Sequence, residues 1–347
     1  MSGHRRGVSA AMMRGVLRAA EVPYTIAVAV RNRRFDRGHA PTQCAGVPVI
    51  SVGNLTLGGT GKTPLVEWLA RWIRAQGVRV ALVSRGYGAE QGSRNDEALE
   101  LEQKLPDVPH LQNPDRLAAC LVAVEELEMQ LIVLDDGFQH RRLARDLDIV
   151  LIDALEPFGF GHVFPRGTLR EPVASLRRAD IVVLSRADMV DDSRRHALRE
   201  PMAQYAPQAL WCEAVHAPRS LINCWGNFQS HESLQGQSVA AFCGIGNPAG
   251  FRLTLESCGY DVAKFREFPD HHTFSRADID SLGEWADQIG AAAVVCTQKD
   301  LVKIGVPRLG AIPLWAIGVE LQFRVGQNEL ERRLQKLLAD HQLADLP

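Results

Sequence analysis

The sequence predicts an α/β fold, in which a mostly parallel sheet is flanked by helices and a second, smaller α/β domain follows. The first observation is an apolar run, residues 47–52, which leads into a glycine-rich turn and a segment of helical spacing. The second is that apolar runs of strand length alternate with helical segments along most of the 347 residues. This alternation is typical of parallel strands joined by helical crossovers on both faces of a sheet.

The expected elements follow from hydrophobic periodicity. Strands are expected at 47–52, 78–83, 131–136, 148–152, 180–184, 210–215, 239–243, 291–296 and 314–317, and helices at 65–75, 114–127, from 248 and at 327–339. Residues 220–237 are rich in Asn, Gln, Ser and Gly and are typical of a connection. We therefore expect a basic N-terminal helix region (1–40), a core domain (41–225), a smaller α/β domain (238–320) and a C-terminal helix that packs back on the core (321–347).

The composition excludes some classes of protein. A net charge of −2 gives no support for nucleic-acid binding. The seven cysteines are scattered and form no Cys-x-x-Cys pair, so neither a disulfide framework nor a zinc site is indicated. A reducing compartment is the better fit.

The N-terminus is the one anomaly in composition. Residues 1–40 contain eight arginines against Glu21 and Asp36, and the basic clusters flank an apolar run at 22–30. That run is shorter than the roughly 20 residues needed to span a bilayer. It also lacks a signal-peptide cleavage site. Two interpretations remain: a helix lying in the headgroup region of an anionic leaflet, or a basic helix packed on the protein's own surface.

The turn after the first strand has the pattern of a phosphate-binding loop, or P-loop. Gly58, Gly59 and Gly61 allow successive N–H groups to point at a phosphate. Lys62 adds a positive charge for the β- and γ-phosphates, and Thr63 places a hydroxyl for Mg²⁺. The nucleotide-binding residues predicted here are Thr56, Leu57, Gly58, Gly59, Thr60, Gly61, Lys62 and Thr63, with Thr56 standing where the strict pattern has glycine. The pattern predicts a nucleoside triphosphate site.

Two aspartates, Asp135 and Asp136, end the apolar strand expected at 131–136. A carboxylate at the carboxyl end of a strand beside a phosphate loop is placed to hold Mg²⁺, directly or through water. Two aspartates after an apolar strand are otherwise usually solvated loop residues. With the phosphate loop present, we expect a magnesium role.

Further polar residues follow the other strands, at the edge where open α/β sheets bind ligands. Arg85 and Tyr87 follow the second strand, where Arg85 is suited to phosphate and Tyr87 to a sugar or acyl chain. The alternative, which this segment by itself favours, is a glycine turn with a surface arginine. Asp96 lies in the next loop and is a candidate base for an acceptor hydroxyl. The chain also carries Asp115-Arg116, a glycine- and proline-broken loop ending in Arg170-Glu171, an Asp-His-His run at 270–272 and Thr297-Gln-Lys-Asp300.

Taken together, these segments resemble the tetraacyldisaccharide 4′-kinases of lipid A biosynthesis. The matching stretches are 52–64, 84–88, 96–97, 115–116, 134–142, 167–172, 243–248, 268–272 and 297–300. The specific ones are Asp-Asp-Gly-Phe-Gln-His at 135–140 and Asp-His-His at 270–272, whereas the phosphate loop alone is widespread. Thr56 fits as well, since the loop of this family carries that threonine.

The resemblance implies transfer of the γ-phosphoryl group of ATP, with Mg²⁺, to the 4′-hydroxyl of a tetraacylated glucosamine disaccharide 1-phosphate. It implies Asp96 as the base, supported by His271. The other implied catalytic residues are Lys62, Asp136 and Arg170; the implied metal ligands are Thr63, Asp135, Asp136 and Glu171; and the implied substrate-binding residues are Arg85, Tyr87 and Arg116. The basic N-terminal helix of the family rests on the cytoplasmic face of the inner membrane, which favours peripheral or monotopic membrane contact here.

Two other functions are compatible with the phosphate loop. One is a P-loop GTPase or ATPase switch, or a protein that assembles metal sites, since Ser185-Arg-Ala-Asp188 faintly resembles the Asn-Lys-x-Asp reader of guanine. The other is a non-catalytic membrane-binding module that has kept a nucleotide loop. The joint presence of Lys62, Asp136, Asp96 and His271 argues against the latter.

Overall fold

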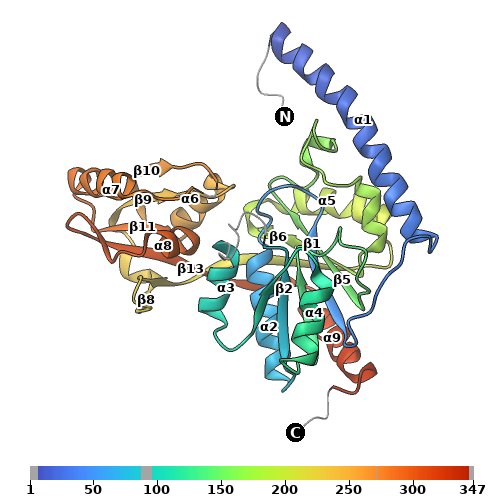
Figure 1. Ribbon diagram of the computed structural model, residues 1–347. Coiled ribbons are helices and arrows are strands. Elements are labelled where there is room, and N and C mark those ends of the chain that lie inside the picture. Colours follow the sequence, from blue (N-terminus) through green and yellow to red (C-terminus); the bar gives the residue numbers. More distant parts are fainter. Residues whose placement is uncertain (1–6, 87–95, 271, 344–347) are drawn as a thin grey trace. The chain divides into compact units, whose positions relative to one another are not determined.

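The computed structural model describes residues 7–86, 96–270 and 272–343, with side chains in the helix that begins at Asp96 described from Ala98 onward (Figure 1). The described chain forms two compact units. The first comprises the residues up to 86, residues 105–215 and the residues from 322 onward. The second comprises the helix Asp96–Lys104 and residues 216–321.

The first unit is built on a parallel sheet in the order β7-β6-β5-β1-β4-β2-β3. Its strands are β1 (Val49–Asn54), β2 (Val80–Ser84), β3 (His110–Gln112), β4 (Leu131–Asp135), β5 (Leu147–Asp153), β6 (Ile181–Ser185) and β7 (Leu210–Ile222). Strands β1, β4, β5 and β6 are buried along their whole length, as expected for a parallel sheet covered on both faces. A mostly parallel sheet flanked by helices, predicted from the alternation of apolar runs, is thus confirmed.

Most helices of this unit bury a stripe of apolar residues. The helices are α1 (Val8–Asp36), α2 (Lys62–Ala75), α4 (Arg116–Glu125), α5 (Asp192–Tyr205) and α9 (Gln327–Asp340). In α2 the buried residues Leu65, Leu69 and Ile73 recur every four positions and so lie on one face. Helix α5 buries Leu198 and Met202 in a cluster with residues of β5 and β6.

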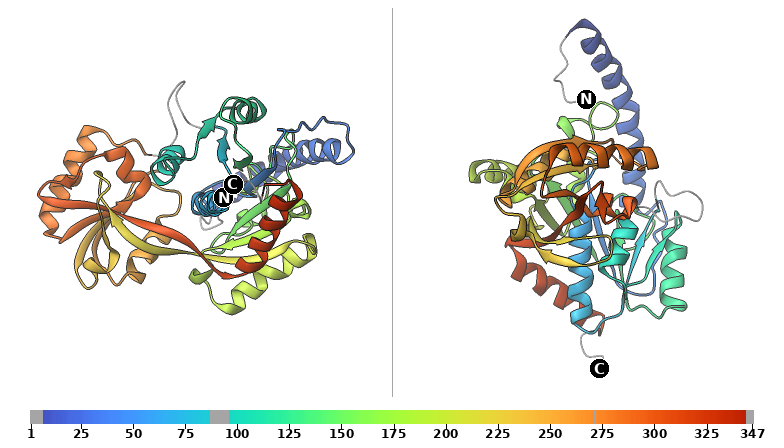
Figure 2. Two further views of the ribbon diagram at one scale, coloured as in Figure 1. Left: turned by 90° about the horizontal axis from the view of Figure 1, so that it is seen from below. Right: turned by 90° about the vertical axis from the view of Figure 1, so that its left-hand side faces the viewer.

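The second unit carries a parallel sheet in the order β10-β9-β11-β13. Its elements are α3 (Asp96–Lys104), β8 (Phe228–Ser230), β9 (Ser238–Cys243), α6 (Pro248–Ser257), β10 (Asp261–Glu267), α7 (Arg276–Ile289), β11 (Ala293–Thr297), α8 (Gln298–Ile304), β12 (Arg308–Leu309) and β13 (Ile312–Val325). The short strands β8 and β12 pair antiparallel with β7 and β13. The chain passes between the two units within β7 and again within β13 (Figure 2).

Several elements differ from expectation. Strands β7 and β13 have 13 and 14 residues, whereas only 210–215 and 314–317 were expected. Most of their remaining residues are partly buried or exposed, so they lack the continuous apolar run on which the prediction depended. Strand β10 and helices α3 and α7 were not predicted. For α7 a signal existed, because Ser275 and Asp278 form a capping box at its start.

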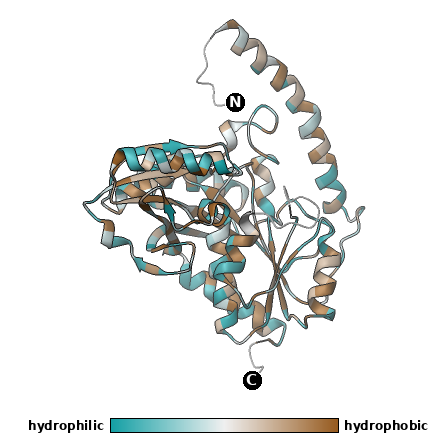
Figure 3. Ribbon diagram, turned by 60° about the vertical axis from the view of Figure 1, so that its left-hand side comes forward, coloured by the Kyte–Doolittle hydropathy of each residue, from teal (hydrophilic) through white to brown (hydrophobic). Residues whose placement is uncertain are grey.

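The N-terminal helix α1 is a single element of 29 residues. Only Val28 and Asn32 are buried in it, and hydrophobic and hydrophilic residues are mixed along its length (Figure 3). Its large apolar side chains with the greatest exposure are Val8, Met12, Met13, Val16, Val22, Ile26 and Val30. No helix in the described part of the chain is both long and apolar enough to cross a membrane.

Candidate active site

The phosphate loop connects β1 to α2 and depends on its glycines. Gly58 and Gly61 have φ values of 109° and 82°, which L side chains rarely adopt. Gly61 immediately precedes the first residue of α2, Lys62. The start of α2 therefore presents its first N–H groups toward the loop, where an anion is stabilised by the helix dipole.

Side chains from neighbouring strands hold the loop in place. The Asn54 amide donates to the Thr60 hydroxyl at 3.0 Å, and the Ser185 hydroxyl donates to the Thr60 carbonyl at 2.7 Å. Arg186 donates to the Gly59 carbonyl at 3.2 Å and is ion-paired with Asp153. Asp153 and Ser185 end β5 and β6, so parallel strands bring them to the same edge of the sheet. The Ser185-Arg-Ala-Asp188 segment therefore supports the phosphate loop.

Thr56 has a different partner from the rest of the loop. It forms an antiparallel bridge with Leu169, and the Leu57 N–H donates to the Thr168 carbonyl at 2.7 Å. The Arg170 N–H donates to the Leu55 carbonyl, also at 2.7 Å. The glycine- and proline-broken segment before Arg170 thus pairs with the beginning of the phosphate loop, a long-range contact that the sequence pattern did not reveal.

Asp136 is the centre of a charged cluster beside the loop. Arg170 Nη1 donates to its Oδ1 and Oδ2 at 2.9 and 2.7 Å, and Lys62 Nζ lies 3.5 Å from Oδ1. Burial alone would raise the pKa of Asp136, but the charges of Lys62, Arg170 and Arg116 and the Arg170 hydrogen bonds lower it to about 2. The structure therefore brings together three predicted catalytic residues from distant parts of the chain: Lys62, Asp136 and Arg170.

Arg116 and His140 lie next to this cluster. Arg116 is 6% exposed and donates to the backbone carbonyl of Asp136 at 3.3 Å. Burial lowers the pKa of Arg116, Asp136 opposes that effect, and Arg85 adds to it. Burial and the charges of Arg116 and Arg145 lower the pKa of His140 to about 4. His140 is thus a neutral imidazole at neutral pH. Sequence analysis assigned no separate role to this residue.

Oxygen donors for a magnesium ion lie around the same cluster. Asp135 is 4% exposed and its Oδ1 accepts from the Asp136 N–H at 2.9 Å. Thr63, in the first turn of α2, is also buried. Among the residues that the structure describes, no group of three or more His, Cys, Asp or Glu side chains is arranged to hold a metal. A hydroxyl and one or two carboxylates fit Mg²⁺, which is usually bound by few protein ligands plus substrate phosphates.

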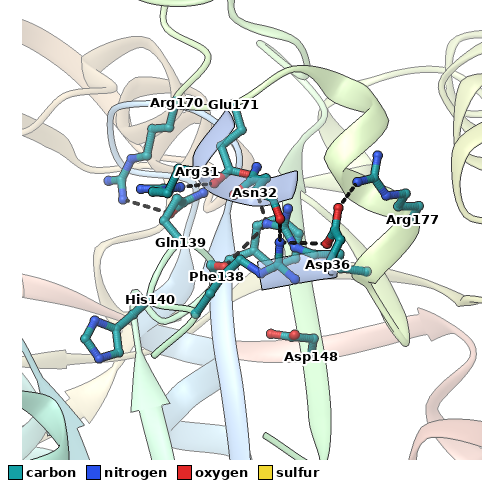
Figure 4. Close-up of polar contacts among 12 residues, drawn as sticks. Arg31, Asn32, Asp36, Phe138, Gln139, His140, Asp148, Arg170, Glu171 and Arg177 are labelled. Carbon is teal, nitrogen blue, oxygen red and sulfur yellow. Dashed lines mark hydrogen bonds and ion pairs between the residues drawn. The ribbon is translucent and has the colours of Figure 1, made fainter. Parts of the chain in front are cut away.

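Glu171, predicted as a metal ligand, has other partners. Its side chain is fully buried, and the carboxylate accepts from Arg31 at 2.5 Å, Asn32 at 3.1 Å and Arg178 at 2.8 Å (Figure 4). Arg31 and Asn32 belong to α1. Because three donors engage the carboxylate inside the protein, we assign Glu171 to the support of the site and propose no metal role for it.

The structure describes only some of the remaining predicted site residues. Arg85 directly follows β2 and is exposed. Asp96 begins α3, but its side chain, like residues Tyr87 and His271, lies outside the described residues. In the second unit, Nε2 of His272 lies at hydrogen-bonding distance, 3.3 Å, from Oδ2 of Asp278. Sequence analysis assigned no role in the first unit to several residues that contact the phosphate loop or Glu171: Arg31, Asn32, Asn54, Asp153 and Arg178.

Comparisons with known proteins identify the family of this chain. The sequence model of the family described as tetraacyldisaccharide-1-P 4′-kinase matches residues 13–339. A tetraacyldisaccharide 4′-kinase of Anaeromyxobacter sp. (strain K) is 41% identical over 96% of this chain and 93% of the relative. One from Geobacter sulfurreducens is 34% identical over 97% of each.

A solved structure is similar as well. LpxK from Aquifex aeolicus, crystallised in complex with ATP, is 29% identical and superposes with a TM-score of 0.72. The match covers 95% of this chain and 99% of that one. The predicted family and the predicted P-loop core are thereby confirmed. The chain belongs to the tetraacyldisaccharide-1-P 4′-kinase family.

Proposed function

We propose that this protein is an ATP-dependent kinase of lipid A biosynthesis. It transfers the γ-phosphoryl group of ATP to the 4′-hydroxyl of a tetraacylated glucosamine disaccharide 1-phosphate. The observation that carries the proposal is the Lys62–Asp136–Arg170 cluster beside the phosphate loop, in a chain of this family. A P-loop switch is not proposed, because the relatives are kinases and Ser185 and Arg186 already have a role in supporting the loop.

The phosphate loop, residues 56–63, binds the triphosphate. Its backbone N–H groups and the start of α2 receive the β- and γ-phosphates, and Lys62 offsets their charge. Arg170 and Arg116 add two further cations near Asp136. Since phosphoryl transfer depends mainly on positioning and on stabilising charge, these cations are the chief contribution of the first unit.

Thr63, Asp135 and Asp136 would hold Mg²⁺. The Asp136 carboxylate is ionised at neutral pH, as a metal ligand requires, and its lowered pKa keeps it ionised in more acidic solution than an ordinary aspartate. When bound, the ion neutralises charge on the transferring phosphate. In the structure, Lys62 and Arg170 compensate the Asp136 carboxylate.

Asp96 and His271 act on the acceptor hydroxyl, with Asp96 as the base. This assignment rests on the family resemblance of residues 96–97 and 268–272. We assign Arg85, Tyr87 and Arg116 to the acceptor or its phosphate. Arg85 supports this role through its exposed position at the carboxyl edge of the sheet.

The first half of α1 binds the anionic surface of the membrane, so the enzyme is peripheral or monotopic at the cytoplasmic face of the inner membrane. Exposed Val8, Met12 and Val16 recur every four residues, and Arg14 and Arg18 lie among them. An exposed apolar stripe with interspersed arginines is suited to the interface of an anionic leaflet.

The test is transfer of labelled phosphate. The purified protein is incubated with γ-labelled ATP, Mg²⁺ and purified tetraacyldisaccharide 1-phosphate in detergent, and the product is tested for a phosphate at the 4′ position. Lys62→Ala should remove transfer and remain folded, whereas Arg71→Ala, an exposed change on the same helix, should retain it. Absence of transfer by a folded wild-type protein, or equal transfer by Lys62→Ala, would contradict the proposal.

A further inference from the structure

The second half of α1 contains one buried polar residue, Asn32, whose side chain binds Glu171. Asn32 is 6% exposed although most of the helix is exposed. Its amide donates to Oε2 of Glu171, 139 residues away in the chain, at 3.1 Å. Because burying an amide is unfavourable unless it is hydrogen-bonded, this contact fixes the end of α1 against Glu171.

Glu171 depends on α1 for two of its three donors. Arg31 and Asn32 come from α1, and the third donor, Arg178, comes from the segment that follows Glu171. The carboxylate is fully buried, and a buried charge that loses a partner is strongly destabilised. Glu171 therefore keeps this position only while α1 is docked, and Figure 4 shows Arg31 and Asn32 turned toward it.

Arg170 connects Glu171 and α1 to the phosphate site. Arg170 precedes Glu171, and its carbonyl accepts from the Tyr24 hydroxyl of α1 at 3.3 Å. Its guanidinium is bound to Asp136. Helix α1 thus holds the backbone of Arg170 and the side chain of the next residue, while Arg170 holds the carboxylate beside Lys62.

A second set of contacts ties α1 to the other side of Asp136. Arg141, five residues after Asp136, donates to the Asn32 carbonyl at 2.9 Å and is ion-paired with Asp36 at 2.8 Å. Asp36 also pairs with Arg177 at 2.6 Å. Displacement of α1 would therefore strain both chain segments that meet at the Arg170–Asp136 pair.

We propose that α1 is a positioning element of the phosphoryl-transfer site. Asn32 and Arg31 hold Glu171, and Glu171 holds Arg170 where it pairs with Asp136. The inference rests on the proposed function for its effect on turnover. It adds that the helix assigned to the membrane also sets the catalytic geometry, so that its docking changes kcat in addition to recruitment.

The test is a double-mutant cycle between Asn32→Leu and Arg170→Ala. Leucine is branched at Cγ as asparagine is, and it lacks the donor. Turnover is measured in detergent micelles saturated with acceptor, so that membrane recruitment limits no variant. If Asn32 acts through Arg170, Asn32→Leu should lower kcat about tenfold in the wild-type background and less than twofold in the Arg170→Ala background.

Arg33→Ala is the matched control, because it removes an exposed arginine next to Asn32 that forms no ion pair with any residue that the structure describes. It should change kcat less than twofold in both backgrounds. If Asn32→Leu does not fold, as judged by circular dichroism, Arg31→Ala takes its place, since the Arg31 side chain is 45% exposed. Multiplicative losses in the cycle, or an undiminished kcat in a folded Asn32→Leu or Arg31→Ala variant, would overturn the proposal.

Calorimetric binding of Mg·ATP gives a readout that does not depend on the acceptor. Asn32→Leu should weaken nucleotide binding in the wild-type background and leave it unchanged in the Arg170→Ala background. If the wild-type protein binds ATP with this pattern but does not phosphorylate the disaccharide, the proposed function fails and the positioning role stands. If transfer occurs and both cycles are additive, the positioning role fails alone.

Discussion

Arg170 and Asp136 form a bifurcated contact across 34 residues of sequence, in which one guanidinium nitrogen lies 2.9 and 2.7 Å from the two carboxylate oxygens. Lys62 approaches the same carboxylate at 3.5 Å. The contact joins the strand that ends in the two aspartates to the loop that pairs with Thr56. Charge compensation around Asp136 is therefore a property of the folded state, with consequences for stability and for metal binding.

The first prediction concerns pH and stability. The pKa of Asp136 is about 2 in the folded state against an ordinary 3.8, so the folded state binds this proton less readily than the unfolded state. The resulting stabilisation is fully present above about pH 4 and is lost as the pH falls toward 2. Between pH 4 and pH 2, the free energy of unfolding should fall more for the wild type than for Asp136→Asn, as measured by urea unfolding. Parallel pH profiles would contradict the assignment.

The second prediction concerns magnesium. If Thr63 and the aspartate pair hold the ion, Thr63→Val and Asp135→Asn should each raise the Mg²⁺ concentration needed for half-maximal turnover, because a hard oxygen ligand is lost or weakened. Glu171→Gln should not shift that requirement, since the Glu171 carboxylate is bound by Arg31, Asn32 and Arg178. A magnesium titration of each variant at saturating ATP decides this. Full activity in excess EDTA would contradict the metal site itself.

The third prediction concerns the support of the phosphate loop by Arg186. Its guanidinium contacts the Gly59 carbonyl and the Asp153 carboxylate, and its φ of 53° fixes the turn after β6. Arg186→Ala should raise the KM for ATP about tenfold with a smaller effect on kcat, because nucleotide binding loses a preformed loop. Arg199→Ala, on α5, is the control. The double variant Arg186→Ala/Asp153→Ala should raise the KM for ATP by less than the product of the two single increases. Increases that multiply would argue against a shared role of the two residues.

The features that the sequence predicted well are local ones. The glycines at 58, 59 and 61 and the apolar run before Asp135 specify a loop and a strand without distant partners, and both occur as expected. The missed features depend on distant contacts. No sequence pattern indicates that Glu171 contacts Asn32. Nor does any pattern indicate the contact between Ser185 and Thr60, which are 125 residues apart. Sequence alone therefore favours a catalytic role for a charged residue near a phosphate loop, even where its contacts in the fold indicate a supporting role.

The fourth prediction separates the two halves of α1. Removing residues 1–20 deletes exposed Val8, Met12 and Val16 but keeps Glu21, which accepts from the Val163 N–H at 2.8 Å, and everything after it. The truncated protein should bind anionic vesicles less than the wild type and should retain kcat in detergent. Binding of the wild type should weaken with salt, since Debye screening at 0.15 M acts over about 8 Å. Salt-insensitive sedimentation, equal on neutral and anionic vesicles, would contradict the electrostatic part.

The last prediction concerns the residues that act on the acceptor. Asp96 begins α3, and α3 packs on α8 in the second unit, which also carries the 268–272 segment. If Asp96 is the base and His271 supports it, Asp96→Ala should lower kcat far more than it lowers ATP affinity, since the nucleotide is held by the first unit.

His271→Ala should lower kcat less than Asp96→Ala does, and the double variant should lose less than the product of the two single losses, because residues that act as one unit are not additive. His272→Ala is the matched control: its imidazole is paired with Asp278 at 3.3 Å, so its loss should affect stability of the α7 start and leave the pH profile of kcat unchanged. Single-turnover kinetics with saturating ATP isolate the transfer step. An undiminished rate in Asp96→Ala would move the base to another carboxylate, first to Glu97, and multiplicative losses would separate His271 from the base.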